Sequence, residues 1–206
     1  VKFTEKGAII LNMGKNARKK EPKSMKTYLE SIGVPILGEI SGEGTVEGGD
    51  VLWLENNKVA IGRGYRTNDE GIRQFKELVK DIVDEVIVVP MPHGNNEEEC
   101  LHLMSVISPI DKDLAVVYSR YMPVFFRQML IKQGIKLIEV IDDEYMPLGG
   151  NVLTVEPRKV VVLKGNPDTK EKLLKEGVEV YEYEGQHISL PGNGGATCMT
   201  APLLRV

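Results

Sequence analysis

The fold is decided by a stretch that occurs twice, first as Gly48-Gly49-Asp50-Val51-Leu52-Trp53-Leu54-Glu55-Asn56-Asn57-Lys58-Val59-Ala60-Ile61. It returns as Gly149-Gly150-Asn151-Val152-Leu153-Thr154-Val155-Glu156-Pro157-Arg158-Lys159-Val160-Val161-Val162. Each copy reads as an apolar strand, a polar turn and a second apolar strand, which is typical of a β-hairpin. Residues 1–11 and 104–118 have the same shape, with turns predicted at residues 5–7 and 109–113. Hairpins therefore recur at intervals of about fifty residues.

A helical pattern and one more strand follow each hairpin. The helices are predicted at residues 22–32, 69–83, 123–133 and 168–176, and glycines end three of them as C-terminal caps, namely Gly33, Gly134 and Gly177. The strands after the helices are predicted at residues 35–40, 85–89, 136–141 and 178–183. The repeating unit is therefore strand, strand, helix, strand.

Repeats of this kind predict one α/β domain over residues 1–206, arranged as a five-fold pseudosymmetric propeller that leaves few exposed sheet edges. The expected units are residues 1–46, 47–99, 100–147, 148–190 and a partial fifth unit at 191–206. We expect Thr197–Val206 to be the opening strand of that unfinished unit. Because the chain begins with Val1, we expect upstream sequence to complete it.

Composition narrows the function classes. The chain has 42 % apolar residues and a net charge of -4, which disfavours nucleic acid as the main partner. A basic cluster within residues 15–26 has no interleaved aromatic residues and is interpreted as a solvated helix face. No apolar run approaches the length of a membrane span. Two cysteines and no visible secretion signal favour a cytoplasmic location, although the missing methionine weakens the second argument.

Three residues are candidates for catalysis: Cys198, after a glycine-rich stretch, with His102 and Asp50. A thiolate nucleophile needs a base that can return a proton and an anion that orients the base or a cationic substrate. Alone, each residue has a simpler interpretation as a buried thiol, a packed histidine or a turn aspartate. The repeat places all three, with Asn151, near the start of the first strand of successive units. We therefore expect them to converge on one channel.

The sequence resembles the guanidino-group-modifying enzymes of the pentein fold, which include arginine deiminases, dimethylarginine dimethylaminohydrolases and amidinotransferases. The resemblance rests on Glu47-Gly48-Gly49-Asp50-Val51-Leu52, Gly62-Arg63-Gly64-Tyr65-Arg66-Thr67-Asn68, His102-Leu103 and Gly194-Gly195-Ala196-Thr197-Cys198-Met199-Thr200. It implies Cys198 as nucleophile, His102 as general acid and base, and Asp50 as a carboxylate that holds the guanidinium. It also implies that Arg66 binds the α-carboxylate of the substrate, although Arg66 could instead lie near a helix cap at Asn68.

The resemblance implies hydrolysis of an arginine-like guanidino group through a covalent amidino-thioether, without a metal or organic cofactor. Met104 stands where arginine deiminases and amidinotransferases typically have an aspartate, a departure shared with the dimethylarginine hydrolases. Amidino transfer to an acceptor amine and a non-catalytic pentein binding protein stay open as alternatives. A homodimer is allowed, and no nucleic-acid or membrane partner is expected. The loop from His93 to the acidic run Glu97-Glu98-Glu99 is either a mobile lid or a plain surface loop.

Overall fold

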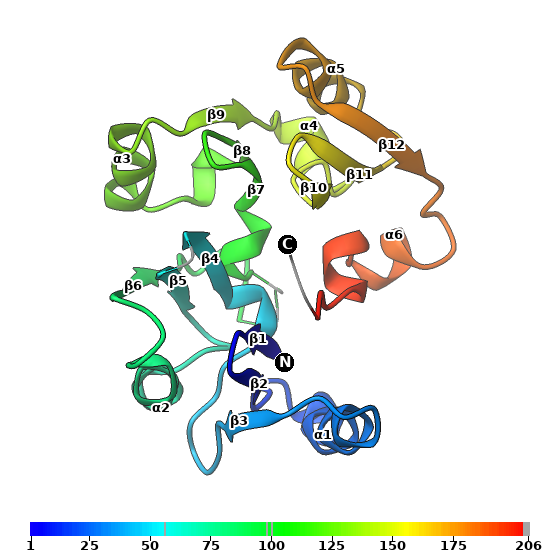
Figure 1. Cartoon of the computed structure of the whole chain (residues 1–206). Coiled ribbons are helices and arrows are strands. Elements are labelled where there is room, and N and C mark those ends of the chain that lie inside the picture. Colours follow the sequence, from blue (N-terminus) through cyan, green and yellow to red (C-terminus); the bar gives the residue numbers. More distant parts are fainter. Residues whose placement is uncertain (56, 98, 100, 204–206) are drawn as a thin grey trace. The chain divides into compact units, whose positions relative to one another are not determined.

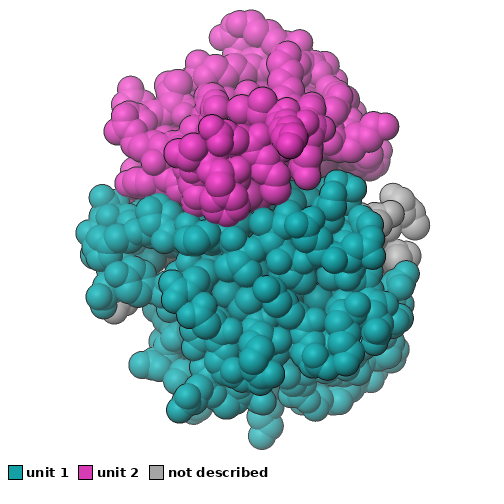
Figure 2. Space-filling model, turned by 90° about the vertical axis from the view of Figure 1, so that its left-hand side faces the viewer, with its two compact units in different colours: residues 1–103, 201–206 teal, residues 104–200 magenta. Residues whose placement is uncertain are grey.

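The computed structural model describes residues 1–55, 57–97, 99 and 101–203. The chain divides into two compact units, one formed by Val1–Leu103 with the segment after Thr200, the other by Met104–Thr200 (Figure 2). The predicted single domain over residues 1–206 therefore stays a prediction, and each unit is described by itself.

Unit 1 contains two modules of the predicted type, strand, strand, helix, strand (Figure 1). The first consists of β1 (Lys2–Thr4), β2 (Gly7–Ile10), α1 (Glu21–Ser31) and β3 (Ile36–Glu39). The second consists of β4 (Val51–Glu55), β5 (Lys58–Arg63), α2 (Asp69–Val79) and β6 (Glu85–Pro90). In both sheets the middle strand pairs antiparallel with the preceding strand and parallel with the following one.

Unit 2 repeats this topology twice. Its modules are β7 (Ile107–Asp111), β8 (Leu114–Val117), α3 (Val124–Lys132) and β9 (Lys136–Glu139), then β10 (Leu153–Glu156), β11 (Lys159–Leu163), α5 (Pro167–Lys175) and β12 (Glu179–Tyr183). Two short helices that the sequence did not predict, α4 (Asp142–Tyr145) and α6 (Ser189–Gly192), lie between these elements. The α/β class and the four repeated modules are thus confirmed.

Local chemistry explains why these elements form where they do. Asn68 caps helix α2 by accepting a hydrogen bond of 2.8 Å from the backbone N–H of Gly71. Gly33, Gly134 and Gly177 have φ between +73° and +81°, the left-handed conformation of a helix C-terminal cap. The middle strands carry fully buried residues: Ile61 of β5 belongs to the apolar core of unit 1, and Val160 of β11 belongs to that of unit 2.

The structure differs from the predictions at two places. Pro109 was predicted to begin a turn, but it lies within β7 and pairs with Ala115. A proline is tolerated there because β7 is an outer strand of its sheet, where a missing N–H costs no ladder hydrogen bond. The opening strand expected at residues 197–206 is not found over the described residues 197–203. A 3-10 helix occupies Ala196–Met199 instead, and Cys198 N–H donates to Gly195 O at 3.0 Å.

Short 3-10 turns occupy equivalent places in the repeat. Gly48–Asp50 directly precedes β4, and Leu103–Ser105 precedes β7. Asp50 and His102 therefore lie at the entry to a first strand, as the repeat register predicts, and Asn151 does so just before β10. Cys198 lies within the turn at Ala196–Met199, the same kind of element.

Candidate active-site residues in two units

His102 is held by a buried carboxylate in unit 1. Its Nε2 lies 2.9 Å from Oε2 of Glu47, whose side chain is 1 % exposed, while the His102 side chain is 13 % exposed. A carboxylate can only accept, so the imidazole donates, which fixes the ring orientation. Glu47 thus has the position of a residue that orients a general acid or base.

The surroundings of Glu47 keep it ionised. Burial alone would raise its pKa, but the hydrogen bond and charge of His102, the backbone N–H of Lys15 and the charge of Arg66 outweigh burial and lower the pKa. Lys15 N–H lies 3.0 Å from Glu47 Oε1, and Arg66 Nη1 lies 3.7 Å from the same oxygen. Glu47 is therefore an anion that three donors surround.

Asp50 accepts hydrogen bonds from two protein groups in unit 1. Leu103 N–H donates to its Oδ1 at 2.9 Å, and the Thr67 hydroxyl donates to its Oδ2 at 2.6 Å. The residue is 1 % exposed, and burial raises its pKa despite the opposing effects of His102 and these two donors. Each oxygen of the Asp50 carboxylate thus accepts from a protein group, one of which is the backbone N–H directly after His102. The predicted contact of Asp50 with a substrate guanidinium stays a prediction.

Glycines make room for these side chains. A Cβ on Gly49 would lie 2.6 Å from Nδ1 and 2.7 Å from Cγ of His102. A Cβ on Gly62 would lie 2.5 Å from Oδ1 of Asp50. Gly49 and Gly62 are therefore required by close approach to the side chains of this site.

Arg66 lies in the same cluster. Its side chain is 8 % exposed and forms the ion pair with Glu47. The next residue, Thr67, is fully buried, and its hydroxyl accepts from Glu47 N–H at 3.1 Å while donating to Asp50. The predicted contact of Arg66 with a substrate carboxylate stays a prediction.

Glu47 was not among the predicted site residues, although it belongs to the motif Glu47-Gly48-Gly49-Asp50-Val51-Leu52. Two carboxylates three residues apart, Glu47 and Asp50, were both available as partners of His102. Which of them faces the imidazole is decided by the turn at Gly48–Asp50, and that turn has no clear periodic signal in the sequence.

Cys198 lies in unit 2 and is exposed. The side-chain amide of Asn151 donates to its Sγ at 3.3 Å, and Thr197 donates to Oδ1 of the same amide. From the sequence, Asn151 was placed by repeat register near the start of the first strand of its unit, with no contact to Cys198 predicted. The predicted convergence of Cys198 with His102 concerns two units that are described separately, and it stays a prediction.

The predicted lid loop makes several described contacts, among them Asn95 Nδ2 donating to Glu99 Oε1 at 3.2 Å and Glu99 N–H donating to Asn96 Oδ1 at 3.0 Å. The Tyr65 hydroxyl lies 2.8 Å from Nδ1 of His93, and the two rings pack edge to face at 5.8 Å. Cys100 and Glu98, which the sequence analysis also considered, lie outside the described residues. The lid stays a prediction.

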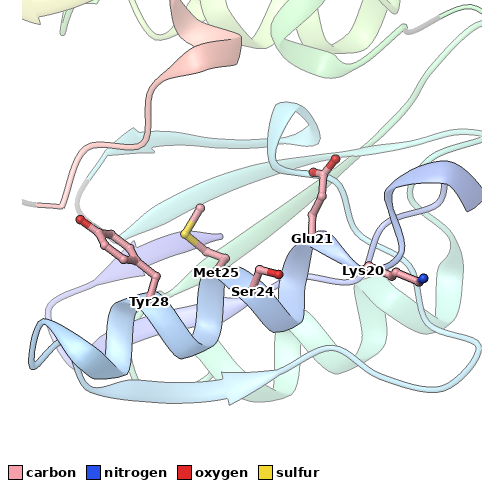
Figure 3. A pocket seen from close by; sticks show the side chains of 5 residues that line it. All are labelled: Lys20, Glu21, Ser24, Met25 and Tyr28. Carbon is pink, nitrogen blue, oxygen red and sulfur yellow. The ribbon is translucent and has the colours of Figure 1, made fainter.

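The described part of the chain contains no group of three or more His, Cys, Asp or Glu residues placed to hold a metal ion. No described helix is long and apolar enough to cross a bilayer. A surface pocket lies along α1, lined by Lys20, Glu21, Ser24, Met25 and Tyr28 (Figure 3). None of its lining residues belongs to the predicted catalytic set.

Comparison with known proteins places the chain in the guanidino-group-modifying superfamily with the pentein type of fold. Residues 2–205 match the family model described as N,N dimethylarginine dimethylhydrolase, eukaryotic, and the chain belongs to this family.

Individual relatives agree with this assignment. An uncharacterized protein, YkgA of Bacillus subtilis (strain 168), is 30 % identical over 198 residues, which are 96 % of this chain and 65 % of that protein. An arginine deiminase of Rhodococcus erythropolis (strain PR4 / NBRC 100887) is 30 % identical over 191 residues, which cover 78 % of this chain and 46 % of the relative. The chain thus spans between about half and just under two thirds of these relatives.

Solved structures show the same fold. A dimethylarginine dimethylaminohydrolase from Pseudomonas aeruginosa, a cysteine-to-serine mutant complexed with citrulline, matches with a TM-score of 0.79 at 24 % identity, over 97 % of this chain and 72 % of that one. ArgZ, an arginine dihydrolase from the ornithine-ammonia cycle in cyanobacteria, matches with a TM-score of 0.83 at 20 % identity, over 99 % of this chain and 31 % of that one.

Proposed function

We propose that this protein hydrolyses the guanidino group of arginine or a methylated arginine, with Cys198 as nucleophile and His102 as general acid and base. The observation that carries the proposal is the hydrogen bond between His102 Nε2 and the buried, ionised Glu47. A histidine oriented in this way by a carboxylate is suited to proton transfer. Family membership supports the choice of a guanidino substrate.

The first half-reaction forms a carbon–sulfur bond. The Cys198 thiolate adds its electron pair to the central guanidinium carbon, and the bond from that carbon to the leaving nitrogen then breaks. His102 gives its proton to that nitrogen, so ammonia or a methylated amine departs and a covalent amidino-thioether stays on Cys198. The positive charge on the imidazole is offset by Glu47 at 2.9 Å.

The second half-reaction consumes water. His102 takes a proton from a water molecule whose oxygen attacks the amidino carbon, and the carbon–sulfur bond then breaks with its electrons returning to Cys198. The product is a ureido amino acid. Protein groups alone supply the nucleophile and the proton carrier in this scheme.

Methylated arginine is the favoured substrate. Met104 follows His102 by two residues and brings no carboxylate, and a less polar surrounding accommodates N-methyl groups better than a paired acid does. The family model that matches the chain is that of a dimethylarginine hydrolase. Arginine itself stays within the proposal because arginine deiminases are among the relatives.

A product assay tests the proposal. Arginine, dimethylarginine and agmatine are each incubated with the protein, and a colorimetric assay measures the ureido product with and without an added acceptor amine. We expect a ureido product without an amine, and none from Cys198→Ser. Cys100→Ser is the matched control and should retain activity. Product that forms only with an amine would favour amidino transfer. If no product forms and Cys198 is not alkylated, a non-catalytic binding protein would be favoured.

A further inference from the structure

Asn151 and Cys198 are connected by a hydrogen bond that the proposed reaction has not yet used. The amide nitrogen Nδ2 of Asn151 donates to Sγ of Cys198 at 3.3 Å, although 47 residues separate them in the sequence. Both residues belong to unit 2. The contact therefore needs no assumption about how the two units are arranged.

The orientation of this amide is determined by its other partners. The Thr197 backbone N–H lies 3.2 Å from Asn151 Oδ1, and the Thr197 hydroxyl donates to the same oxygen at 2.8 Å. A backbone N–H can only donate, so the oxygen of the amide must face Thr197. The nitrogen must then face the sulfur. Two donors on the oxygen also polarise the amide and strengthen its N–H as a donor.

The backbone around Asn151 is held in place. Asn151 N–H donates to Leu148 O at 2.9 Å, and Leu148 has the left-handed φ of 65°. The buried Ser108 hydroxyl donates to Gly150 O at 2.7 Å and accepts from Val152 N–H at 3.3 Å, so it connects the residues on both sides of Asn151.

The turn that carries the cysteine is shaped around this amide. A Cβ on Gly195 would lie 2.2 Å from Oδ1 and 2.4 Å from Cγ of Asn151. Only glycine permits this approach, which brings the turn at Ala196–Met199 against the amide. The glycine-rich stretch before Cys198 thus lets the chain approach Asn151, in addition to forming a turn.

We propose that Asn151 is a positioning residue for the proposed nucleophile: its amide, oriented by Thr197, donates a hydrogen bond that holds the Cys198 sulfur in place. A hydrogen bond to a charged acceptor is about twice as strong as one to a neutral acceptor, so the contact is strongest while the sulfur is the attacking thiolate. The inference rests on the proposed role of Cys198 as nucleophile. It assigns to Asn151 a function beyond its place in the repeat.

The test measures the rate at which Cys198 reacts with iodoacetamide at neutral pH, with peptide mapping to separate Cys198 from Cys100. Asn151→Asp keeps the size of the side chain but replaces the N–H donor by an anion, and Asn151→Leu removes both polar groups. In both variants we expect the alkylation of Cys198 to slow by about tenfold or more, because the attacking thiolate loses one charge-assisted hydrogen bond. Asn193→Asp adds the same charge to an exposed residue nearby and should change the rate less than twofold.

Thr197 supplies a second pair of variants. Thr197→Val removes the hydroxyl that polarises the amide and should slow alkylation, whereas Thr197→Ser keeps the donor and should restore the rate. Thermal unfolding by circular dichroism shows whether each variant is folded. A purely structural role would lower the melting temperature of Thr197→Val without changing the rate at which the folded protein is alkylated.

Two outcomes overturn the inference. One is a folded Asn151→Asp or Asn151→Leu protein that is alkylated within twofold of the parent rate, and the other is an unchanged alkylation rate in Thr197→Val. The assay requires no turnover, so it separates this inference from the proposed function. Slow alkylation in the variants supports the role of Asn151 even if the parent protein forms no ureido product.

Discussion

His102 Nε2 lies 2.9 Å from Oε2 of Glu47, and Glu47 is 1 % exposed. Glu47, rather than Asp50, is thus the charged partner of the proposed acid and base.

Replacing the Glu47 anion while keeping its shape, as in Glu47→Gln, removes the negative charge that offsets the imidazolium charge of His102. We expect kcat to fall by about ten- to a hundredfold, the worth of one hydrogen bond to a charged group. Steady-state kinetics measures this, and the exposed Glu43→Gln serves as control. An unchanged kcat in Glu47→Gln would mean that the pair does not take part in proton transfer.

The stability of the protein toward acid depends on the same pair. The pKa of Glu47 is lower in the folded protein than its ordinary value, so its contribution is present above the unfolded pKa and is lost as the pH falls through the folded pKa. We therefore expect Glu47→Gln to be less stable than the parent at neutral pH, with the difference shrinking below about pH 4. Urea unfolding at both pH values measures it. A difference that grows on acidification would contradict the lowered pKa.

Asp50 is predicted to act through the backbone. Its oxygens accept from Leu103 N–H and from the Thr67 hydroxyl, so Asp50→Asn leaves a buried donor without an acceptor. The expected cost is about 1–3 kcal/mol in the free energy of unfolding. Thr67→Val should cost a similar amount because it removes the bridge to Glu47 N–H, and Thr67→Ser, which keeps the hydroxyl, should cost less. If Asp50→Asn instead raises KM with unchanged stability, the originally predicted contact with the guanidinium is correct.

Gly49 should not tolerate a side chain. In Gly49→Ala the new methyl group would lie within 2.9 Å of three atoms of His102, and the ring is held on its other side by Glu47. We expect activity to be lost together with about 1–3 kcal/mol of stability, a typical cost of overpacking. Gly192→Ala is the matched control, because nothing lies within 4 Å of its added Cβ. Activity assays and thermal unfolding compare the two, and full activity in Gly49→Ala would show that His102 does not need this position.

Two substrates distinguish between the two possible roles of Arg66, which are binding of the α-carboxylate and the ion pair with Glu47. Agmatine lacks the α-carboxylate of arginine, so a residue that binds this carboxylate affects only the amino-acid substrate. If Arg66 binds it, Arg66→Gln should raise KM for an arginine-type substrate about tenfold or more and leave agmatine kinetics unchanged. If Arg66 acts only through its ion pair with Glu47, both substrates should lose kcat equally. Parallel kinetics with the two substrates decides between these roles.

Much of the fold could be predicted because its signals are local. The hairpins follow from apolar strands around polar turns, and the ends of three helices follow from Gly33, Gly134 and Gly177, whose left-handed φ values agree with the prediction. Pro109 was misassigned because sequence alone does not show that β7 is an outer strand. The turn at Ala196–Met199 was missed because part of its support comes from a distant side chain: Thr197 N–H donates to Oδ1 of Asn151, 46 residues earlier.

The candidate site was predicted less completely. Cys198 and His102 were selected by residue type and repeat register, which the sequence contains. The partners Glu47 and Asn151 depend on where side chains point over separations of 55 and 47 residues. The glycines were the one sequence signal for these contacts, because a side chain at Gly49 would collide with His102 and one at Gly195 would collide with Asn151. That requirement becomes visible only when the packed neighbours are known.

Covalent labelling of Cys198 during turnover tests the central claim most directly. The protein is incubated with dimethylarginine, quenched in acid and digested, and mass spectrometry of the Cys198 peptide is followed alongside the ureido product. We expect an amidino adduct on Cys198 together with ureido product in the parent protein, and neither adduct nor product in Cys198→Ser. Formation of ureido product by Cys198→Ser at the parent rate would contradict the proposal that this thiol carries the reaction.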